Sequence, residues 1–341
     1  MGKKLPEKTS LAPVDNSSDE LFASLKGLEE KSESKLSLSY IPSFFTTASL
    51  PFKNINKTEF VRKGSNGISL ILNSPKNVPF GKYGRLLLSV FTTHAVISKI
   101  KDAPVEIEFE SLSQLLREMQ LPRQRGQDIQ EQLECFKKAT FSFEQKVEKQ
   151  EQAYLFKNLY GPDEKLPKRD VTVRTTSTGT ILFTEGVQYQ EIFDEKSKNP
   201  RIGKFKIILS ANFAHFCQQH GVPINYTVYK DISSPVGKDI YAWLVYRNNC
   251  MEENGEIFIP RKSLIEQFVI SNNSESKESN ERVGYLRIIE QIRIIKEKYY
   301  PGLKVNIDSH GDGITLLKSP PVIEEKDKRY ILITQDILGI E

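Results

Sequence analysis

The stretch Lys238-Asp-Ile-Tyr-Ala-Trp-Leu-Val-Tyr-Arg247 decides how the C-terminal third of the chain folds. Ile240, Trp243, Leu244 and Arg247 stand three or four residues apart, which is the spacing of one helix face. The preceding Ser233-Ser234-Pro235 supplies a capping hydroxyl and a proline that suits a first helical turn. The sequence therefore predicts a helix with a well-marked start.

Two more helices and a hairpin are predicted after this one. The second helix begins at Pro260 and ends in the polar stretch 271–276, with an apolar face of Leu264, Ile265 and Phe268. The third runs to about Tyr299 and is closed by Tyr300-Pro301-Gly302, with a stripe of Tyr285, Ile288, Ile292, Ile295 and Tyr299. Alternation over 303–307, a turn over 308–313 and a return strand over 314–318 predict a wing. This order is typical of a winged helix-turn-helix.

Residues 80–147, earlier in the chain, show a similar order of helices and strands. An apolar helix is predicted from Gly84 to Lys99, and a strand from Val105 to Phe109. Ser111-Leu-Ser-Gln114 fits the capping box of a second helix. A third helix begins at Arg123-Gln-Arg125-Gly-Gln-Asp and has Ile129, Leu133 and Phe136 on one face.

The sheet and wing of this first part are predicted from two alternating segments. One runs from Ala139 to Val147, and the other runs from Val171 to Phe193 with a turn at Thr178-Gly179. The stretches 148–152 and 160–170 are expected to be solvated connections, and the segment 202–216 is expected to open a second domain.

We therefore expect an α+β protein with two tandem winged-helix domains and a disordered N-terminal tail. The tail, 1–38, is rich in Lys, Glu, Ser and Pro and poor in aromatic residues. The expected domains are a first winged-helix domain at 39–200 and a second at 201–322. A C-terminal tail at 323–341 follows.

Composition narrows the class of protein. The 341 residues are 38% hydrophobic and 27% charged, which is a globular balance. Apolar runs are shorter than the ~18 residues of a membrane span, and the start lacks the apolar core of a signal peptide, so we expect a cytoplasmic protein with no membrane partner. A net charge of +4 permits nucleic-acid binding, and it requires any basic surface to be local.

The third helix of each part is the expected DNA-reading helix, because a helix fits the major groove of DNA. Guanidinium and amide groups pair bidentately with guanine and adenine. The candidate DNA-binding residues are Arg123, Gln124, Arg125 and Gln127 in the first part, and Lys277, Ser279, Asn280, Arg282, Arg287 and Lys304 in the second. The alternative is ordinary solvated surface, which the acids Asp128, Glu131, Glu278 and Glu281 favour.

The sequence gives little support for an enzymatic function. The His-hydrophobic-His pair of an origin-nicking enzyme and a Gly-x-x-x-x-Gly-Lys phosphate loop are both missing. His215 and His220 flank Cys217 at a spacing that fits no standard zinc site. We therefore expect no catalytic, cofactor or metal site, and we expect buried or inert thiols at Cys135, Cys217 and Cys250.

The chain resembles the plasmid-encoded RepA-type replication initiators over about residues 78–322. The motifs that carry the resemblance are Phe80-Gly-Lys-Tyr-Gly-Arg-Leu-Leu-Leu88, Thr92-Thr-His-Ala-Val96, Ser111-Leu-Ser-Gln-Leu-Leu-Arg-Glu-Met119, Arg125-Gly126, Val222-Pro-Ile-Asn225, Asp239-Ile-Tyr-Ala-Trp-Leu-Val-Tyr-Arg247, Ser263-Leu-Ile-Glu-Gln-Phe268, Tyr300-Pro301 and Ser319-Pro-Pro-Val322. Two departures are Pro122-Arg-Gln-Arg-Gly126, where such initiators commonly have a glycine-rich turn, and the serine- and glutamate-rich segment 272–280.

The resemblance implies an initiator that binds repeated double-stranded origin sequences called iterons. It further implies opening of adjacent AT-rich DNA, recruitment of host DnaA and replicative helicase, and repression of the initiator's own promoter. A homodimer formed through the first winged-helix domain is also implied.

Two other hypotheses remain open. A sequence-specific transcriptional regulator of the same architecture would bind a lone inverted repeat, whereas an initiator binds tandem direct repeats of about two helical turns. A structural protein that uses winged helices only for protein contacts would bind DNA weakly and with little dependence on salt.

Overall fold

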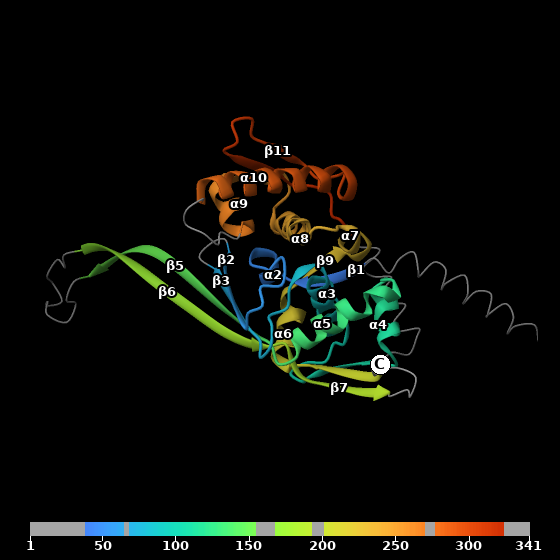
Figure 1. Ribbon diagram of the computed structural model, residues 1–341. Coiled ribbons are helices and arrows are strands. Elements are labelled where there is room, and N and C mark those ends of the chain that lie inside the picture. The colour runs from blue at the N-terminus through green and yellow to red at the C-terminus, as the bar shows by residue number, and fades with distance from the viewer. Residues whose placement is uncertain (1–37, 65–67, 155–167, 193–200, 270–276, 324–341) are drawn as a thin grey trace, which may run out of the picture. The chain divides into compact units, whose positions relative to one another are not determined.

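The computed structural model describes residues 38–64, 68–154, 168–192, 201–269 and 277–323. Residues Leu38–Glu324 form one compact unit of mixed helices and sheets, which confirms the α+β class (Figure 1). The expected C-terminal tail lies outside the described residues beyond residue 323, and so does the expected N-terminal tail up to residue 37. Within the described ranges, no helix combines the length and apolarity that a membrane crossing requires.

The elements follow one another in three groups. The first group is β1 (Leu38–Pro42), α2 (Ser43–Thr47), β2 (Glu59–Lys63), β3 (Ile68–Asn73), α3 (Gly81–Ile97), β4 (Val105–Phe109), α4 (Leu112–Glu118), the 3₁₀ turn η1 (Arg123–Arg125) and α5 (Gly126–Phe136). The second group is β5 (Thr140–Tyr154), β6 (Lys168–Leu182), β7 (Thr184–Ile192), β8 (Arg201–Leu209), α6 (Ala211–His220), β9 (Gly221–Asn225) and α7 (Tyr226–Asp231). The third group is α8 (Pro235–Cys250), β10 (Glu256–Pro260), α9 (Arg261–Phe268), α10 (Lys277–Ile294), the π-helical turn η2 (Ile295–Tyr299), β11 (Val305–Ile307) and β12 (Gly313–Leu317).

Helix α8 starts where the sequence predicts. Pro235 occupies the first turn, and the backbone N–H of Gly237 donates to the Ser234 hydroxyl at 3.2 Å. The expectation of one buried face is wrong, because Lys238, Asp239, Tyr241 and Val245 are buried as well. The reason is that α8 packs against α10 and α9 and also against α2 and α3.

The elements around α8 form a repeat that we call the second repeat: α8, β10, α9, α10, β11 and β12. The predicted hairpin is confirmed, with β11 and β12 paired antiparallel. Strand β10, which the sequence pattern did not indicate, pairs with the other side of β12. The sheet order is therefore β10-β12-β11, the first, third and second strand in chain order.

The first repeat comprises α3, β4, α4, α5, β7 and β8. Its three-stranded sheet has the order β4-β8-β7, which is again first, third and second strand. Strands β7 and β8 thus occupy the place of the expected wing, and the prediction that residues 139–147 form part of it is wrong, because residues 140–147 belong to β5 of another sheet. Strand β8 lies in the segment expected to open the second domain, so the expected boundary at residue 200 falls between two strands of one sheet.

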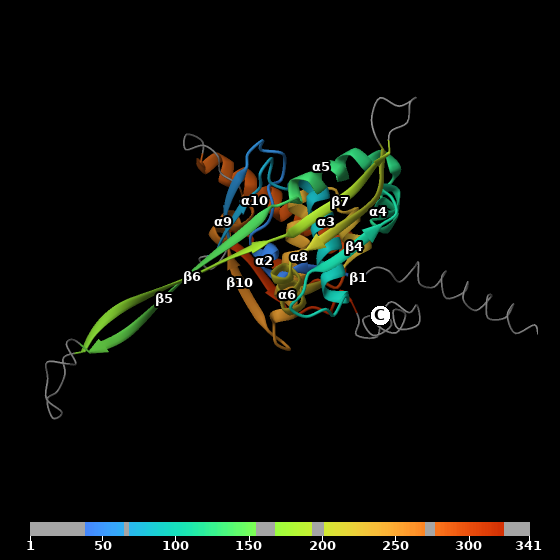
Figure 2. The same cartoon turned by 90° about the horizontal axis from the view of Figure 1, so that it is seen from below.

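Strands β5 and β6 form a long hairpin inserted between α5 and β7 (Figure 2). They pair over 15 residues each, and β5 also pairs with β3, giving the sheet order β2-β3-β5-β6. The predicted turn at Thr178-Gly179 is wrong, because β6 continues through these residues. The strand ends at Leu182 instead, and Phe183 separates it from β7. The stretch 148–152, expected to be a solvated connection, lies within β5, and 168–170 lies within β6.

A cluster of phenylalanine rings forms the core beside these sheets. The Phe183 ring packs, tilted, against Phe141 at 4.8 Å and against Phe213 at 5.2 Å between ring centroids. Phe45, from α2, lies 5.2 Å from Phe141. Segments far apart in sequence therefore share one apolar core, since α2, β5, α6 and the residue after β6 all contribute to it.

Candidate nucleic-acid interface

The first segment expected to read DNA, called the first reader segment below, is the connection between α4 and α5 together with the start of α5. Gln114 N donates to the Ser111 hydroxyl at 3.3 Å, and the Gln114 side chain accepts from Glu110 N at 2.6 Å. This confirms the predicted cap, although the glutamine reaches Glu110 rather than Ser111. Leu115 and Leu116 of α4 and Met119, which follows it, are buried, and Leu112 is half-buried.

Helix α5 is fixed by its own apolar face, which leaves its start facing solvent. Ile129, Leu133 and Phe136 are buried as the periodicity predicted. The candidate residues of this reader segment are all exposed: Arg123, Gln124, Arg125 and Gln127. Arg125 lies 3.5 Å from Asp128, and both side chains are at least two-fifths exposed, so this ion pair leaves the guanidinium accessible.

Helix α10 is the second helix that the sequence predicts to read DNA, and it packs on α8 and α9. Tyr285, Ile288, Ile292 and Ile295 are buried, which confirms the predicted stripe. Gly284 allows the close approach of α9, because a Cβ at this position would lie 2.5 Å from Val269 Cγ2. Glycine at this position therefore sets how closely the two helices pack.

The candidate residues on α10 lie outside its buried stripe. Ser279, Asn280, Arg282 and Arg287 are exposed. Lys277 begins the helix, but its side chain lies outside the described part of the chain, as does the polar stretch 270–276.

Lys304 does not lie at the tip of the β11–β12 hairpin. It is exposed and precedes β11 at the base of the hairpin, where its N–H donates to the Ser319 hydroxyl and its carbonyl accepts from Leu317 N. The tip carries Asp308 and Asp312 instead. Backbone N–H donors, first Asp312 N at 3.1 Å and then His310 N at 2.9 Å, keep the pKa of the Asp308 carboxyl below its usual value. An anionic tip is unsuited to contact with phosphate.

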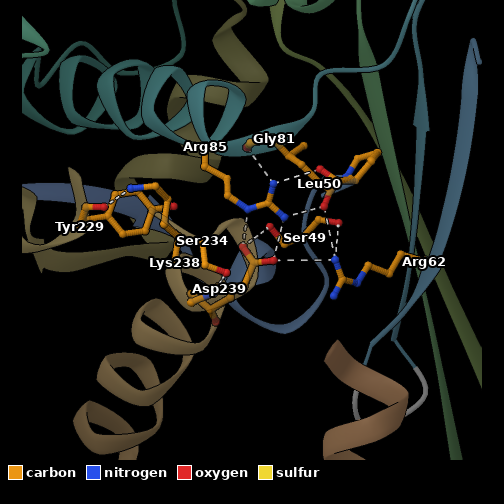
Figure 3. Close-up of polar contacts among 12 residues, drawn as sticks. Ser49, Leu50, Arg62, Gly81, Arg85, Tyr229, Ser234, Lys238 and Asp239 are labelled. Carbon is orange, nitrogen blue, oxygen red and sulfur yellow. Dashed lines mark hydrogen bonds and ion pairs between the residues drawn. The ribbon is translucent and has the colours of Figure 1, made fainter. Parts of the chain in front are cut away.

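The two reader helices are connected through packed helices. α10 packs on α8, α8 on α3, and α3 on α5. At the α3–α8 contact, Arg85 and Asp239 form a buried bidentate pair that Ser49 completes by donating to Asp239 Oδ1 at 2.8 Å (Figure 3). The other Arg85 N–H groups donate to the carbonyls of Leu50, Pro51 and Gly81 at 2.6 to 3.1 Å.

A second buried arginine, Arg62 from β2, joins this cluster. It donates to Gln267 O of α9 at 2.8 Å and lies 3.8 Å from Asp239. Burial lowers the pKa of Arg62 to about 10. The cluster of Arg62, Arg85 and Asp239 is buried and internally hydrogen-bonded, so it positions α3, α8 and α9 and does not offer a ligand site.

Lys238, next to Asp239, is also buried. Its ammonium donates to Tyr229 O and to Lys230 O, and it lies 4.8 Å from the centroid of the Tyr229 ring. Burial, assisted by the nearby Arg85, lowers the Lys238 pKa to about 7.

The histidine and cysteine residues are dispersed. His215 lies 3.6 Å from Asp102, whereas His220 packs on Phe216. Burial raises the pKa of Cys135 to about 11, and it also raises that of Cys217, so both are thiols at neutral pH. Cys250 is a free, exposed cysteine, so of the two expected alternatives, a buried or an inert thiol, burial does not apply to it. In the described ranges, no group of three or more His, Cys, Asp or Glu side chains could hold a metal ion.

Sequence reasoning missed several exposed side chains of the second reader helix. Arg293 lies three helical turns after Arg282 and is exposed on the same side. Val283 and Leu286 are exposed apolar residues between the arginines. The signal for all three was present in the sequence, because they fall outside the stripe of Tyr285, Ile288 and Ile292.

Comparisons with known proteins give limited similarity. No family model and no curated protein matches this sequence. A solved structure of selenomethionine derivatives of domains 2 and 3 of RctB has a TM-score of 0.44 at 10% identity, covering 83% of this chain and 99% of that chain. A second structure of RctB domains 2 and 3 has a TM-score of 0.38 at 10% identity, covering 79% and 92% of the two chains. Similarity at this level carries no conclusion about function.

Proposed function

We propose that this chain is a replication initiator that binds repeated double-stranded origin DNA through two tandem winged-helix modules, the first and second repeats. The observation that carries the proposal is the recurrence of one element order, α-β-α-α-β-β, with one strand order in both sheets. In a winged helix, the third helix enters the major groove and the preceding helix braces it. The third helices here are α5 and α10.

The side chains on these helices suit DNA. Exposed Arg125 and Gln127 at the start of α5, and exposed Arg282 and Arg287 on α10, are forked donors of the kind that read guanine and adenine edges. Arginines that instead contact phosphate supply affinity without sequence preference. Two reader helices on one chain favour tandem repeats over a single site.

The cellular roles in this proposal come from the resemblance to RepA-type initiators. They are iteron binding, opening of adjacent AT-rich DNA, recruitment of host DnaA and replicative helicase, repression of the initiator's own promoter, and a homodimer formed through the first repeat. The proposed protein acts in the cytoplasm by binding, without catalysis and without a cofactor.

Footprinting of the purified full chain on the DNA that flanks its own gene, at two salt concentrations, tests the proposal. We expect protection phased over tandem direct repeats. We also expect affinity to fall by ~0.9 log units per log unit of salt for each phosphate neutralised. One protected palindrome would favour the transcriptional regulator, and weak binding with little salt dependence would favour a protein-contact role.

A further inference from the structure

The outward face of α10 alternates basic and apolar side chains within two turns. Arg282 and Arg287 are exposed, Val283 is 43% exposed and Leu286 is 57% exposed. At 3.6 residues per turn, residue 286 is a neighbour of both 282 and 283, and 287 is a neighbour of 283. The four side chains therefore form one contiguous patch on α10. The helix itself packs on α8 (Figure 1).

Isolated exposed apolar residues are common and need no explanation. This pair differs because it lies between two arginines on the helix that follows the α9–α10 connection. In the major groove, only thymine presents a methyl group, on C5, and apolar side chains contact it, while arginine pairs with guanine N7 and O6. Alternating arginine and apolar side chains thus match a sequence in which guanine and thymine are neighbours.

The same residues fit a protein groove poorly. A helix that docks in a groove presents apolar anchors at i, i+3 or i+4, and i+7. Counting from Val283, the i+3 position is Leu286, but the i+7 position is Glu290, which is exposed. Glu290 therefore interrupts the apolar stripe after one turn, before the exposed Ile294. Three exposed arginines on this side of the helix, Arg282, Arg287 and Arg293, outnumber that acid and complement DNA.

We propose that Val283 and Leu286 are specificity-determining residues that contact thymine methyl groups in the major groove, beside guanines paired by Arg282 or Arg287. This inference rests on the proposed function, because it requires α10 to enter DNA. It adds the chemical group that is recognised, the C5 methyl, and the residues that recognise it.

Uracil lacks only the C5 methyl of thymine, so replacing thymines by uracils tests the inference directly. The full chain first selects its preferred duplex from a random pool, and each thymine of that duplex is then changed to uracil in turn. Loss of one methyl contact is expected to weaken binding about fourfold at one or two positions. For Leu286→Ala or Val283→Ala, thymine and uracil should bind equally at one of those positions.

The matched control is Val61→Ala, which truncates a valine that is 53% exposed on β2, outside α10. This variant should keep the uracil effect. Two outcomes overturn the inference while leaving the proposed function intact: no thymine position is sensitive to uracil, or the sensitivity persists in both α10 variants. If the full chain selects no duplex at all, the proposed function fails and the inference falls with it. Unchanged thymine preference together with lost self-association in Leu286→Ala would assign this face to a protein contact.

Discussion

Arg85 donates from Nε to Asp239 Oδ1 at 2.7 Å and from Nη2 to Asp239 Oδ2 at 2.8 Å, and this pair joins α3 to α8. Each of these helices begins one of the two repeats. The side chains are 1% and 3% exposed, so neither charge has access to water that could replace its partner. The relative placement of the two repeats therefore depends on this pair and on its hydrogen-bonded neighbours.

Removal of one partner of this pair should strongly destabilise the fold. Asp239→Asn leaves Arg85 and Arg62 buried without a carboxylate, and such losses cost about 3 to 5 kcal/mol. Urea unfolding of the full chain measures the change. Ser49→Ala is the matched control, because it removes only one hydrogen bond to Asp239 and should cost about 1 kcal/mol. Equal effects of the two variants would show that the ion pair is not the main contact.

Arginines that read bases should be separable from arginines that contact phosphate. Arg125→Ala and Arg282→Ala are each expected to weaken DNA binding by about 1 to 3 kcal/mol and to relax one base position if they read bases. A uniform loss across sequences, with a smaller salt slope, would assign them to phosphate. Lys101→Ala, which removes an exposed lysine outside both reader segments, should leave binding unchanged. Quantitative binding to the selected duplex and to single-base variants of it makes the measurement.

The helical glycines of the two reader segments should respond in opposite ways to alanine. At Gly284 a Cβ would lie 2.5 Å from Val269 Cγ2, so Gly284→Ala should cost about 1 to 3 kcal/mol, and Val269→Ala should relieve that cost in the double variant. At Gly126 the nearest contact would be an ordinary 3.5 Å to Leu112 Cδ2, so Gly126→Ala should stabilise by about 0.4 to 1 kcal/mol. Thermal and urea unfolding distinguish these outcomes. If Gly126→Ala destabilises the fold, the space around an added Cβ does not decide the effect of alanine at these glycines.

Stability should depend on pH through Lys238. Its pKa is about 7 in the folded chain, whereas an unfolded lysine titrates near ~10.4, so between these values the unfolded chain binds one more proton. Unfolding free energy should therefore rise with pH above 7 and should be lowest, for this group, below pH 7. From pH 7 to about 8.5, the unfolding free energy of wild type should rise by about 1 to 2 kcal/mol relative to that of Lys238→Met. If the unfolding free energies of the two proteins change equally with pH, the pKa of Lys238 in the folded chain is not lowered.

Local patterns predicted the helices because helix periodicity needs no information about partners. Tyr285, Ile288, Ile292 and Ile295 form the buried stripe of α10 as their spacing requires, and the Ser234 cap marks the start of α8. Sheet partners could not be predicted in the same way. The pairing of β8 with β4 was not predicted, because β4 lies about 100 residues earlier in the chain.

Gly179 illustrates why one turn was wrong. Thr178-Gly179 has the composition of a turn, but Gly179 lies opposite Phe143 within the β5–β6 ladder. A Cβ at residue 179 would lie 2.6 Å from Phe143 Cζ, so the glycine makes room for the ring of its cross-strand neighbour. Of the candidate site residues, Arg125, Arg282 and Arg287 were proposed from charge and spacing, whereas Val283 and Leu286 were overlooked although their positions outside the buried stripe indicated exposure.

The pairing of β1 with β9 sets the order in which a nascent chain can fold. Strand β1 (Leu38–Pro42) can pair only after β9 (Gly221–Asn225) has been synthesised, and β4 can pair only after β8 has been synthesised. A ribosome that has released only the first 200 residues therefore exposes three of the described strands without partners, which are β1, β4 and β7. A fragment cut at residue 200 would keep those open edges permanently, so it should aggregate, whereas a fragment from residue 38 to residue 324 contains every strand partner described.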